Sequence, residues 1–140
     1  MTKARIVIAE TIAETGLNRL RAAGFEVDVQ VDKTPEQLQA ILPGARALIV
    51  RSATMVDAQM LKAGRDLMVV ARAGVGLDNI DVDVATQQGV MVVNAPQSNV
   101  LSAAEHTMAL ILSIARNVPQ AHRALVAGRW ERAKWEGIEL

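Results

Sequence analysis

The segment from Arg72 to Asp81 holds the residues whose types and spacing best suit ligand binding. It follows an apolar run, Leu67–Ala71, and carries Gly74 and Gly76 two positions apart. A glycine-bearing turn after a parallel strand is where open α/β sheets bind ligands, and glycines let backbone amides approach an anion. The dinucleotide pattern G-x-G-x-x-G would need glycine at position 79, where Asn79 stands. The turn therefore predicts binding of an anion such as a carboxylate, and not of a pyrophosphate.

Two more segments are expected at the same edge of the sheet. One predicted strand ends at Arg51 and Ser52, and another leads into the polar stretch Asn94–Asn99. The three segments together offer a guanidinium, a hydroxyl, free backbone amides and carboxamides. Guanidinium groups and oriented amides both stabilise anions, so this set predicts a site for a small carboxylate or phosphate ester.

Each candidate also has a purely structural explanation. Arg51 and Arg72 fit solvated surface charges, Gly74 and Gly76 fit a tight turn, and Asn99 fits a helix cap. The residues alone assemble no nucleophile with its base and no complete phosphate loop. They describe half of a binding site without a catalyst.

Three other residues that could do chemistry are better explained by structure. His106 follows Glu105, but adjacent residues of a helix point apart, so a structural histidine is favoured over a general base. Trp130 and Trp135 are favoured as interface anchors over cofactor-stacking residues.

The elements that must position these residues alternate between β-branched runs and helical patterns, which predicts a flavodoxin-like α/β fold with a parallel sheet in the order 2-1-3-4-5. Helix ends are expected at glycines in the left-handed conformation, and helix starts at the capping boxes that begin with Thr11, Thr34 and Ser102 and at Asp81. The expected strands are 5–9, 25–31, 47–50, 67–71 and 90–93, the helices 12–23, 35–43, 57–64 and 81–88, and the terminal glycines Gly24, Gly44, Gly64 and Gly89.

After the fifth strand the pattern changes to a long linker helix over about 102–116. It is apolar nearly all round, which predicts burial against a missing second domain or another subunit. A second helix is expected from Pro119 to about Gly128, and the tail after it has no clear pattern. We therefore expect one domain over 1–98 and linker helices over 99–140.

Composition excludes several classes of protein. The 140 residues carry fifteen basic and fifteen acidic side chains, which argues against nonspecific nucleic-acid binding. There is no cysteine, so there is no disulfide framework and no thiolate zinc site, and two histidines do not predict a metal site. No segment resembles a signal peptide or reaches the roughly 20 apolar residues of a membrane span. The expectation is a cytoplasmic protein without a membrane partner.

At these motifs the chain resembles a known family. The segments Val50–Thr54, Ala71–Asp81, Val93–Pro96, Ser102–His106 and Gly128–Arg132 occur in the order and spacing of the NAD-dependent D-2-hydroxyacid dehydrogenases. Within that family they are similar to the N-terminal part of the branch that acts on 3-phosphoglycerate. The resemblance covers essentially the whole chain.

The resemblance implies a two-domain, homo-oligomeric enzyme that transfers hydride between a 2-hydroxy acid and NAD. For this branch the reaction is oxidation of 3-phosphoglycerate to 3-phosphohydroxypyruvate in L-serine biosynthesis. Residues 1–98 would form the substrate-binding domain, and the long helix would open the nucleotide-binding domain and help to form the dimer. The dinucleotide fingerprint would begin shortly after Leu140, with the catalytic residues further on. The chain would then be a fragment that is inactive alone.

The resemblance also implies roles for single residues. Arg51 matches a substrate-binding arginine and Ser52 a substrate contact, while Val75 and Gly76 match the turn whose amides hold the substrate carboxylate. Val75 also lies where some members touch the nicotinamide. Asn99 matches a polar substrate contact, and Val100 matches a cofactor-facing position. Arg72 and Arg132 match basic residues that bind the phosphate end, and Arg132 would come from a neighbouring subunit.

Two alternatives stay open. The chain could belong to a family member that acts on a different 2-hydroxy or 2-keto acid. It could also be a stand-alone flavodoxin-like module for binding or dimerisation, with no enzymatic partner domain.

Overall fold

The computed structural model describes residues 3–140. The chain divides into two compact units, the first ending at Ser98 and the second spanning Asn99–Leu140, and each is described by itself. The first unit alternates strands and helices as predicted. Its elements are β1 (Arg5–Ile8), α1 (Glu14–Ala22), β2 (Glu26–Val29), α2 (Pro35–Ile41), β3 (Ala47–Val50), α3 (Ala58–Ala63), β4 (Val69–Arg72), α4 (Val82–Gln87) and β5 (Met91–Asn94).

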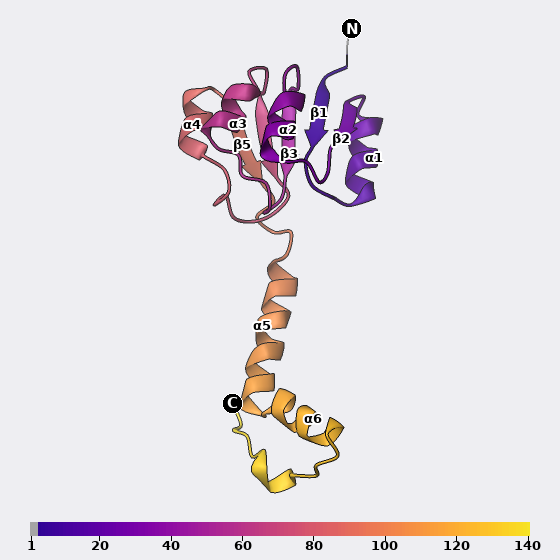
Figure 1. Cartoon of the computed structure of the whole chain (residues 1–140), viewed down its shortest axis with the longest axis vertical. Coiled ribbons are helices and arrows are strands. Elements are labelled where there is room, and N and C mark those ends of the chain that lie inside the picture. The colour runs from indigo at the N-terminus through magenta and orange to yellow at the C-terminus, as the bar shows by residue number, and fades with distance from the viewer. Residues whose placement is uncertain (1–2) are drawn as a thin grey trace. The chain divides into compact units, whose positions relative to one another are not determined.

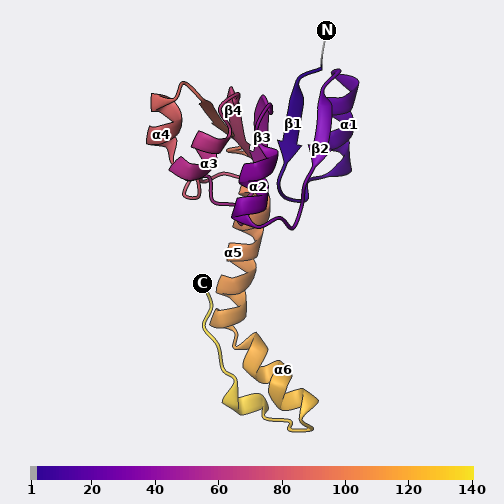
Figure 2. The same cartoon turned by 45° about the horizontal axis from the view of Figure 1, so that its top comes forward.

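The five strands form one parallel sheet in the order β2-β1-β3-β4-β5, which confirms the predicted order. Figure 2 shows β1 between β2 and β3. The register pairs Val7 with Leu48 and Leu48 with Val70, so these side chains share one face of the sheet. All strands run in the same direction, and their carboxyl ends meet at one edge.

Helices cover both faces of the sheet, as the sequence predicts. On one face, α2, α3 and α4 lie side by side (Figure 1), and they enclose the main core. That core joins Val7, Leu48 and Val70 of the sheet to Leu38 of α2 and Met60 of α3. A smaller core on the other face packs α1 against β1. Its buried members are Ile6, Ile8 and Leu17.

The two edge strands of the sheet differ in character. The outer strand β2 carries Glu26 and Asp28 and is bounded by one neighbour, β1. At the opposite edge, β5 has the uncharged sequence Met-Val-Val-Asn, with the Met91 side chain 63% exposed and Val93 also exposed. Only the β2 edge therefore bears charged side chains.

Two of the predicted helix starts are confirmed. At α2, the Thr34 hydroxyl accepts a hydrogen bond from the Gln37 amide at 3.3 Å, and the Gln37 side chain accepts one from the Thr34 amide at 3.0 Å. Pro35 occupies the first turn, where its missing N–H costs nothing. At α4, the Asp81 carboxylate accepts from the Val84 amide at 3.0 Å.

Two other capping predictions are wrong. Thr11 lies upstream of the true start of α1, whose first helical hydrogen bonds go to the carbonyl of Ala13. Ser102 lies inside the long helix, because the helix already begins after Asn99, whose carbonyl accepts from the Ala103 amide at 2.8 Å. In both cases a box-like residue pair is present, but the first backbone hydrogen bond forms elsewhere.

The third helix ends at Gly64 as predicted, but the backbone conformation of this glycine differs from the expected one. Gly24, Gly44 and Gly89 have φ of 90°, 80° and 71°, as predicted for left-handed positions. Gly64 does not, since its φ is −85°. A Cβ atom there would overlap the side chain of Leu67, so this position needs glycine for close packing and not for its backbone conformation.

The second unit consists of α5 (Val100–Ala115), α6 (Val118–Val126) and a short 3₁₀ helix, η1 (Arg132–Lys134), in the tail where no element was expected. Asn117 joins the two long helices in a left-handed conformation with φ of 52°. The tail returns to this junction. The Ile138 amide donates to the Ala115 carbonyl at 2.9 Å, and the Asn117 side chain donates to the Glu136 carbonyl at 2.7 Å.

Large apolar side chains are exposed along the whole of α5, in agreement with its all-round hydrophobic pattern. Leu110 and Leu112 are each half exposed, and Ile114 is 74% exposed. Among residues 3–140, no helix combines the length and the hydropathy that crossing a membrane would require. Large exposed apolar patches mark interaction surfaces on soluble proteins, so these side chains make α5 a candidate interface.

We expect the chain to self-associate through α5, most simply as a two-fold dimer. Replacing Leu110 and Leu112 together by lysine places charge on two sides of the helix and should give a monomer in light scattering at micromolar concentration. The control is Lys62→Glu, which changes an exposed charge on α3 and should leave the association unchanged. A stable monomer of the unmodified chain would contradict this prediction.

Candidate functional site

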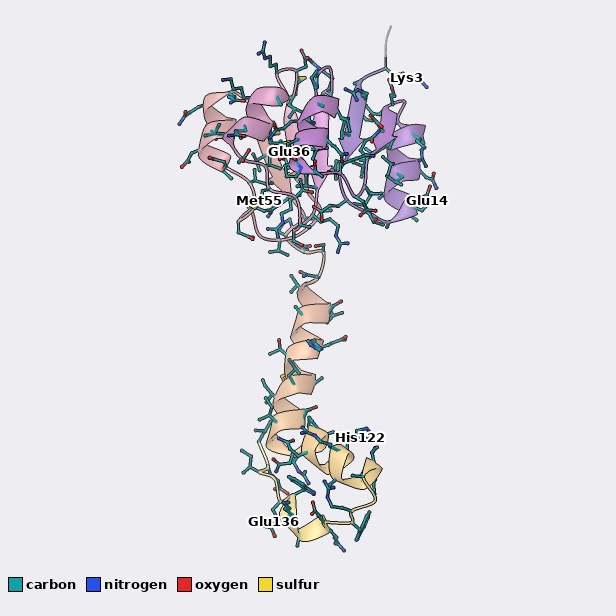
Figure 3. All side chains as sticks on the ribbon, in the orientation of Figure 1. Lys3, Glu14, Glu36, Met55, His122 and Glu136 are labelled. Atoms are coloured by element: carbon teal, nitrogen blue, oxygen red, sulfur yellow. The ribbon has the colours of Figure 1, made fainter. Side chains whose placement is uncertain are left out.

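The loops after β3, β4 and β5 meet at the carboxyl edge of the sheet, where Figure 3 labels Met55. Backbone hydrogen bonds join the loops in sequence. The Ala73 amide donates to Val50 at 2.8 Å, and the Ala95 amide donates to Gly74 at 2.9 Å. The Asn94 side chain adds a bond of 2.7 Å to the Val75 carbonyl. The structure thus brings together the predicted segments that carry Arg51, Ser52, Arg72, Val75 and Gly76.

Glu10, a residue that no sequence motif marks, holds the loop after β3. Its carboxylate accepts backbone hydrogen bonds from Arg51 at 2.8 Å, Thr54 at 3.0 Å and Ala53 at 3.2 Å. These partners are 41 to 44 residues away in the chain. One carboxylate just after β1 therefore fixes the amides of the loop that presents Arg51.

Asn79 holds the same loop by donating to the backbone carbonyl groups of that loop. Its side-chain amide donates to the Arg51 carbonyl at 2.8 Å and to the Thr54 carbonyl at 2.6 Å. It is the buried polar residue of the described chain, at 2% exposure. The residue that breaks the dinucleotide pattern thus connects the loop after β4 to the loop after β3.

With its backbone held on both sides, Arg51 extends an exposed side chain from the loop. The guanidinium makes one long hydrogen bond of 3.4 Å to the Thr11 carbonyl. It borders a hollow of about 440 Å³ that is also lined by Glu10, Lys33 and Thr54. The guanidinium retains donors that could bind an anionic ligand.

Arg72 is not a plain surface charge. Its side chain is only 10% exposed, and one terminal nitrogen lies 2.6 Å from the Asp78 carboxylate. The pair passes directly against Gly76, where a Cβ atom would come within 2.8 Å of Arg72 and 2.6 Å of Asp78. The glycine at position 76 therefore leaves room for this ion pair as well as exposing its own amide.

Two carboxylates at this edge have a lowered pKa. Partial burial raises the pKa of Glu10, but the backbone hydrogen bonds from Arg51, Thr54 and Ala53 outweigh it and bring that pKa below its ordinary value of 4.5. The hydrogen bond from Arg72 lowers the pKa of Asp78 below 3.8. Both groups are charged at neutral pH and hold their partners through charge-assisted bonds.

The remaining predicted site residues, Asn99, Val100 and Arg132, lie in the second unit. All three are exposed. Asn99 is the N-cap residue of α5, as the helix-cap explanation expects, but its side chain makes no capping hydrogen bond. The exposed His106 lies on α5, and no cluster of three or more metal-binding side chains occurs in the described part of the chain.

The tail tryptophans of the same unit differ in environment. Trp130 is 79% exposed. Trp135 is half-buried, with the Lys134 ammonium 5.1 Å from the centre of its ring. The interface role predicted for both residues stays a prediction.

The turn at Gly74 and Gly76 does not fit the pyrophosphate of a dinucleotide. Position 79 is occupied by the buried Asn79, and Arg72 with Asp78 fills the space beside Gly76. Exposed Val75 could meet the apolar face of a nicotinamide, but the phosphates of the cofactor would need donors from elsewhere.

The parallel sheet, with the loops after β3, β4 and β5 at its carboxyl edge, makes the first unit an open-sheet α/β structure, a class in which ligands bind at the strand ends. The family model for the catalytic domain of D-isomer specific 2-hydroxyacid dehydrogenases matches residues 6–133. The chain therefore belongs to that family.

The curated relatives include D-3-phosphoglycerate dehydrogenases. The protein of that name from Archaeoglobus fulgidus is 46% identical over 136 residues, which cover 97% of this chain and 26% of the relative. D-3-phosphoglycerate dehydrogenase 2, chloroplastic, from Arabidopsis thaliana is 47% identical over 141 residues, or 22% of its length. The chain thus spans about a quarter of the length of these relatives.

Solved structures share the fold. A crystal structure of a protein from Thermus thermophilus matches 97% of this chain and 45% of its own, with a TM-score of 0.86 and 28% identity. The NAD⁺-bound 3-phosphoglycerate dehydrogenase of Entamoeba histolytica matches 82% of this chain and 40% of its own, with a TM-score of 0.73 and 29% identity.

Replacing Asn79 by alanine should lower the free energy of unfolding by about 1–3 kcal/mol, because two loop carbonyls lose their donor in a buried setting. Urea denaturation measures this change. The matched control is Asn18→Ala on the exposed face of α1, which should change stability by less than about 0.5 kcal/mol. Equal effects of the two substitutions would show that Asn79 does not hold the loop.

Glu10 should make stability depend on pH. Its folded-state pKa is below 4.5, so its stabilising contribution is complete above that pH and is lost as the pH falls through the lowered value. The urea midpoint of the wild type should exceed that of Glu10→Gln at neutral pH, and the gap should narrow below about pH 4.5. Glu26→Gln, on the exposed edge strand, is the control. A gap that stays constant down to about pH 3 would contradict the assignment.

Proposed function

We propose that the chain is the substrate-binding portion of an NAD-dependent dehydrogenase that oxidises 3-phosphoglycerate to 3-phosphohydroxypyruvate in L-serine biosynthesis. The observation that carries the proposal is the loop that presents Arg51. Its backbone is anchored by Glu10 and Asn79 while its guanidinium stays available. The identity of 46–47% to D-3-phosphoglycerate dehydrogenases supports the choice of substrate within the family.

The substrate has two anionic ends, and the edge of the sheet offers two kinds of anion-binding group. Arg51 can form charge-assisted hydrogen bonds to one end, with the Ser52 hydroxyl beside it. The amides of Val75 and Gly76 belong to a turn in which the carbonyls of Gly74 and Val75 already accept hydrogen bonds from the next loop. These amides suit the carboxylate end of the substrate. Arg72 supplies a second guanidinium for the phosphate end.

For the second unit we propose the roles that the family resemblance implies. Asn99 would contact the substrate, Val100 would face the cofactor together with Val75, and Arg132 would serve the phosphate end from a neighbouring subunit. NAD, when bound, would accept the hydride. This chain's own residues would bind and orient the acid, and we assign none of them a catalytic role. The first unit would act as the substrate domain and Asn99–Leu140 as the linker.

Arg51→Ala should weaken binding of 3-phosphoglycerate about 10- to 150-fold, since loss of a charged hydrogen bond costs roughly 1.5–3 kcal/mol. In the whole protein, NAD affinity should change much less. Calorimetric titration with each ligand measures both. Arg65→Ala, which removes an exposed arginine at the opposite end of β4, is the control.

Three results would count against the proposal. Equal losses for both ligands, or none, would make Arg51 structural. Tighter binding of a hydroxy acid without a phosphate would favour another member of the family. Absence of binding to any 2-hydroxy acid would favour a stand-alone flavodoxin-like module.

A further inference from the structure

The ion pair between Arg72 and Asp78 combines a buried cation with an exposed anion. The Arg72 side chain is 10% exposed, whereas that of Asp78 is 79% exposed. The two atoms that pair lie 2.6 Å apart, over Gly76. The carboxylate therefore reaches the guanidinium from the solvent side.

The carboxylate leaves the guanidinium incompletely bonded. Asp78 bonds one terminal nitrogen, and the Arg72 Nε is buried with no hydrogen-bond partner in the described chain. Leaving a buried charged donor without a partner is costly. A phosphate has several acceptor oxygens and can bond more than one donor of the guanidinium, whereas Asp78 bonds a single terminal nitrogen.

We propose that Asp78 is an internal competitor for the anion site: in the free chain its carboxylate occupies Arg72, and a phosphate group of the ligand takes its place on binding. The inference rests on the proposed function for the identity of the ligand, but the exchange itself requires only a phosphate. Asp78 is then an affinity-determining residue, and a substrate contact at Arg72 is available only after the exchange.

The size of the effect follows from the exposure of the pair. Apparent affinity is reduced by the fraction of molecules in which the site is free. Because Asp78 is exposed to solvent, the pair is weak, and we expect the occupied state to lower apparent phosphate affinity by about 2- to 6-fold. The sign separates this from a structural role: if the pair only stiffened the turn, breaking it would weaken binding.

The test uses the 140-residue chain and two probes, inorganic phosphate and 3-phosphoglycerate. Binding is followed by the NMR signal of the Arg72 Nε–H, assigned by its loss in Arg72→Lys. Asp78→Asn keeps the shape of the side chain and removes its charge. Asp83→Asn removes an exposed charge from the following helix and is the matched control. We expect phosphate to shift the signal in the wild type, with affinity about 2- to 6-fold higher in Asp78→Asn only.

The outcomes are distinct. Lower affinity in Asp78→Asn, an equal gain in Asp83→Asn, or an Arg72 signal that phosphate never moves would each overturn the inference. In Arg72→Ala, which has no Nε–H signal, phosphate binding is measured by calorimetric titration. There the gain from Asp78→Asn should vanish, and a gain that persists would also overturn the inference. If phosphate exchanges as expected but 3-phosphoglycerate binds no better than phosphate, the inference stands and the proposed function fails.

Discussion

The site depends on the hydrogen bonds that the backbone of the loop after β3 makes outside the β-sheet. Arg51 and Thr54 stand at the two ends of this loop, and each donates its amide to Glu10 and accepts at its carbonyl from Asn79. Backbone polar groups that lose water must find such partners. Two side chains from different loops thus supply the hydrogen-bond partners of this backbone, and the Arg51 guanidinium stays available to bind a ligand. Without this arrangement the loop after β3 would lose its bonds to Glu10 and its side-chain link to the loop after β4.

The architecture could be predicted because local patterns determine it. Short β-branched runs between helical segments, with right-handed connections, leave few sheet orders, and the observed order is among them. Local signals failed where a nearby competitor existed. Ser102 has the sequence of a helix cap, but the helix begins two residues earlier, at Val100. Gly64 has the position of a left-handed stop, but the packing of Leu67 decides its identity.

The site was only half predictable, for a different reason. Arg51 and the glycine turn stand out by type, whereas Glu10 follows a strand as an ordinary charge, and its partners lie 41 or more residues further on. In the sequence, Asn79 stands out only as an interruption of a glycine pattern. Gly76 illustrates the limit most clearly: a glycine signals that a side chain is unwelcome, but not whether a ligand or a neighbouring ion pair fills the space. Only the fold shows Arg72 and Asp78 there.

The two edge strands of the sheet differ in how readily they can pair with a strand of another molecule. An edge strand with unpaired backbone groups is a template for a further strand, and charged side chains are a common means of discouraging such addition. The edge at β2 has that protection through Glu26 and Asp28, while the edge at β5 presents Met91 and Val93 uncharged. Growth by strand addition would therefore start from β5 and not from β2.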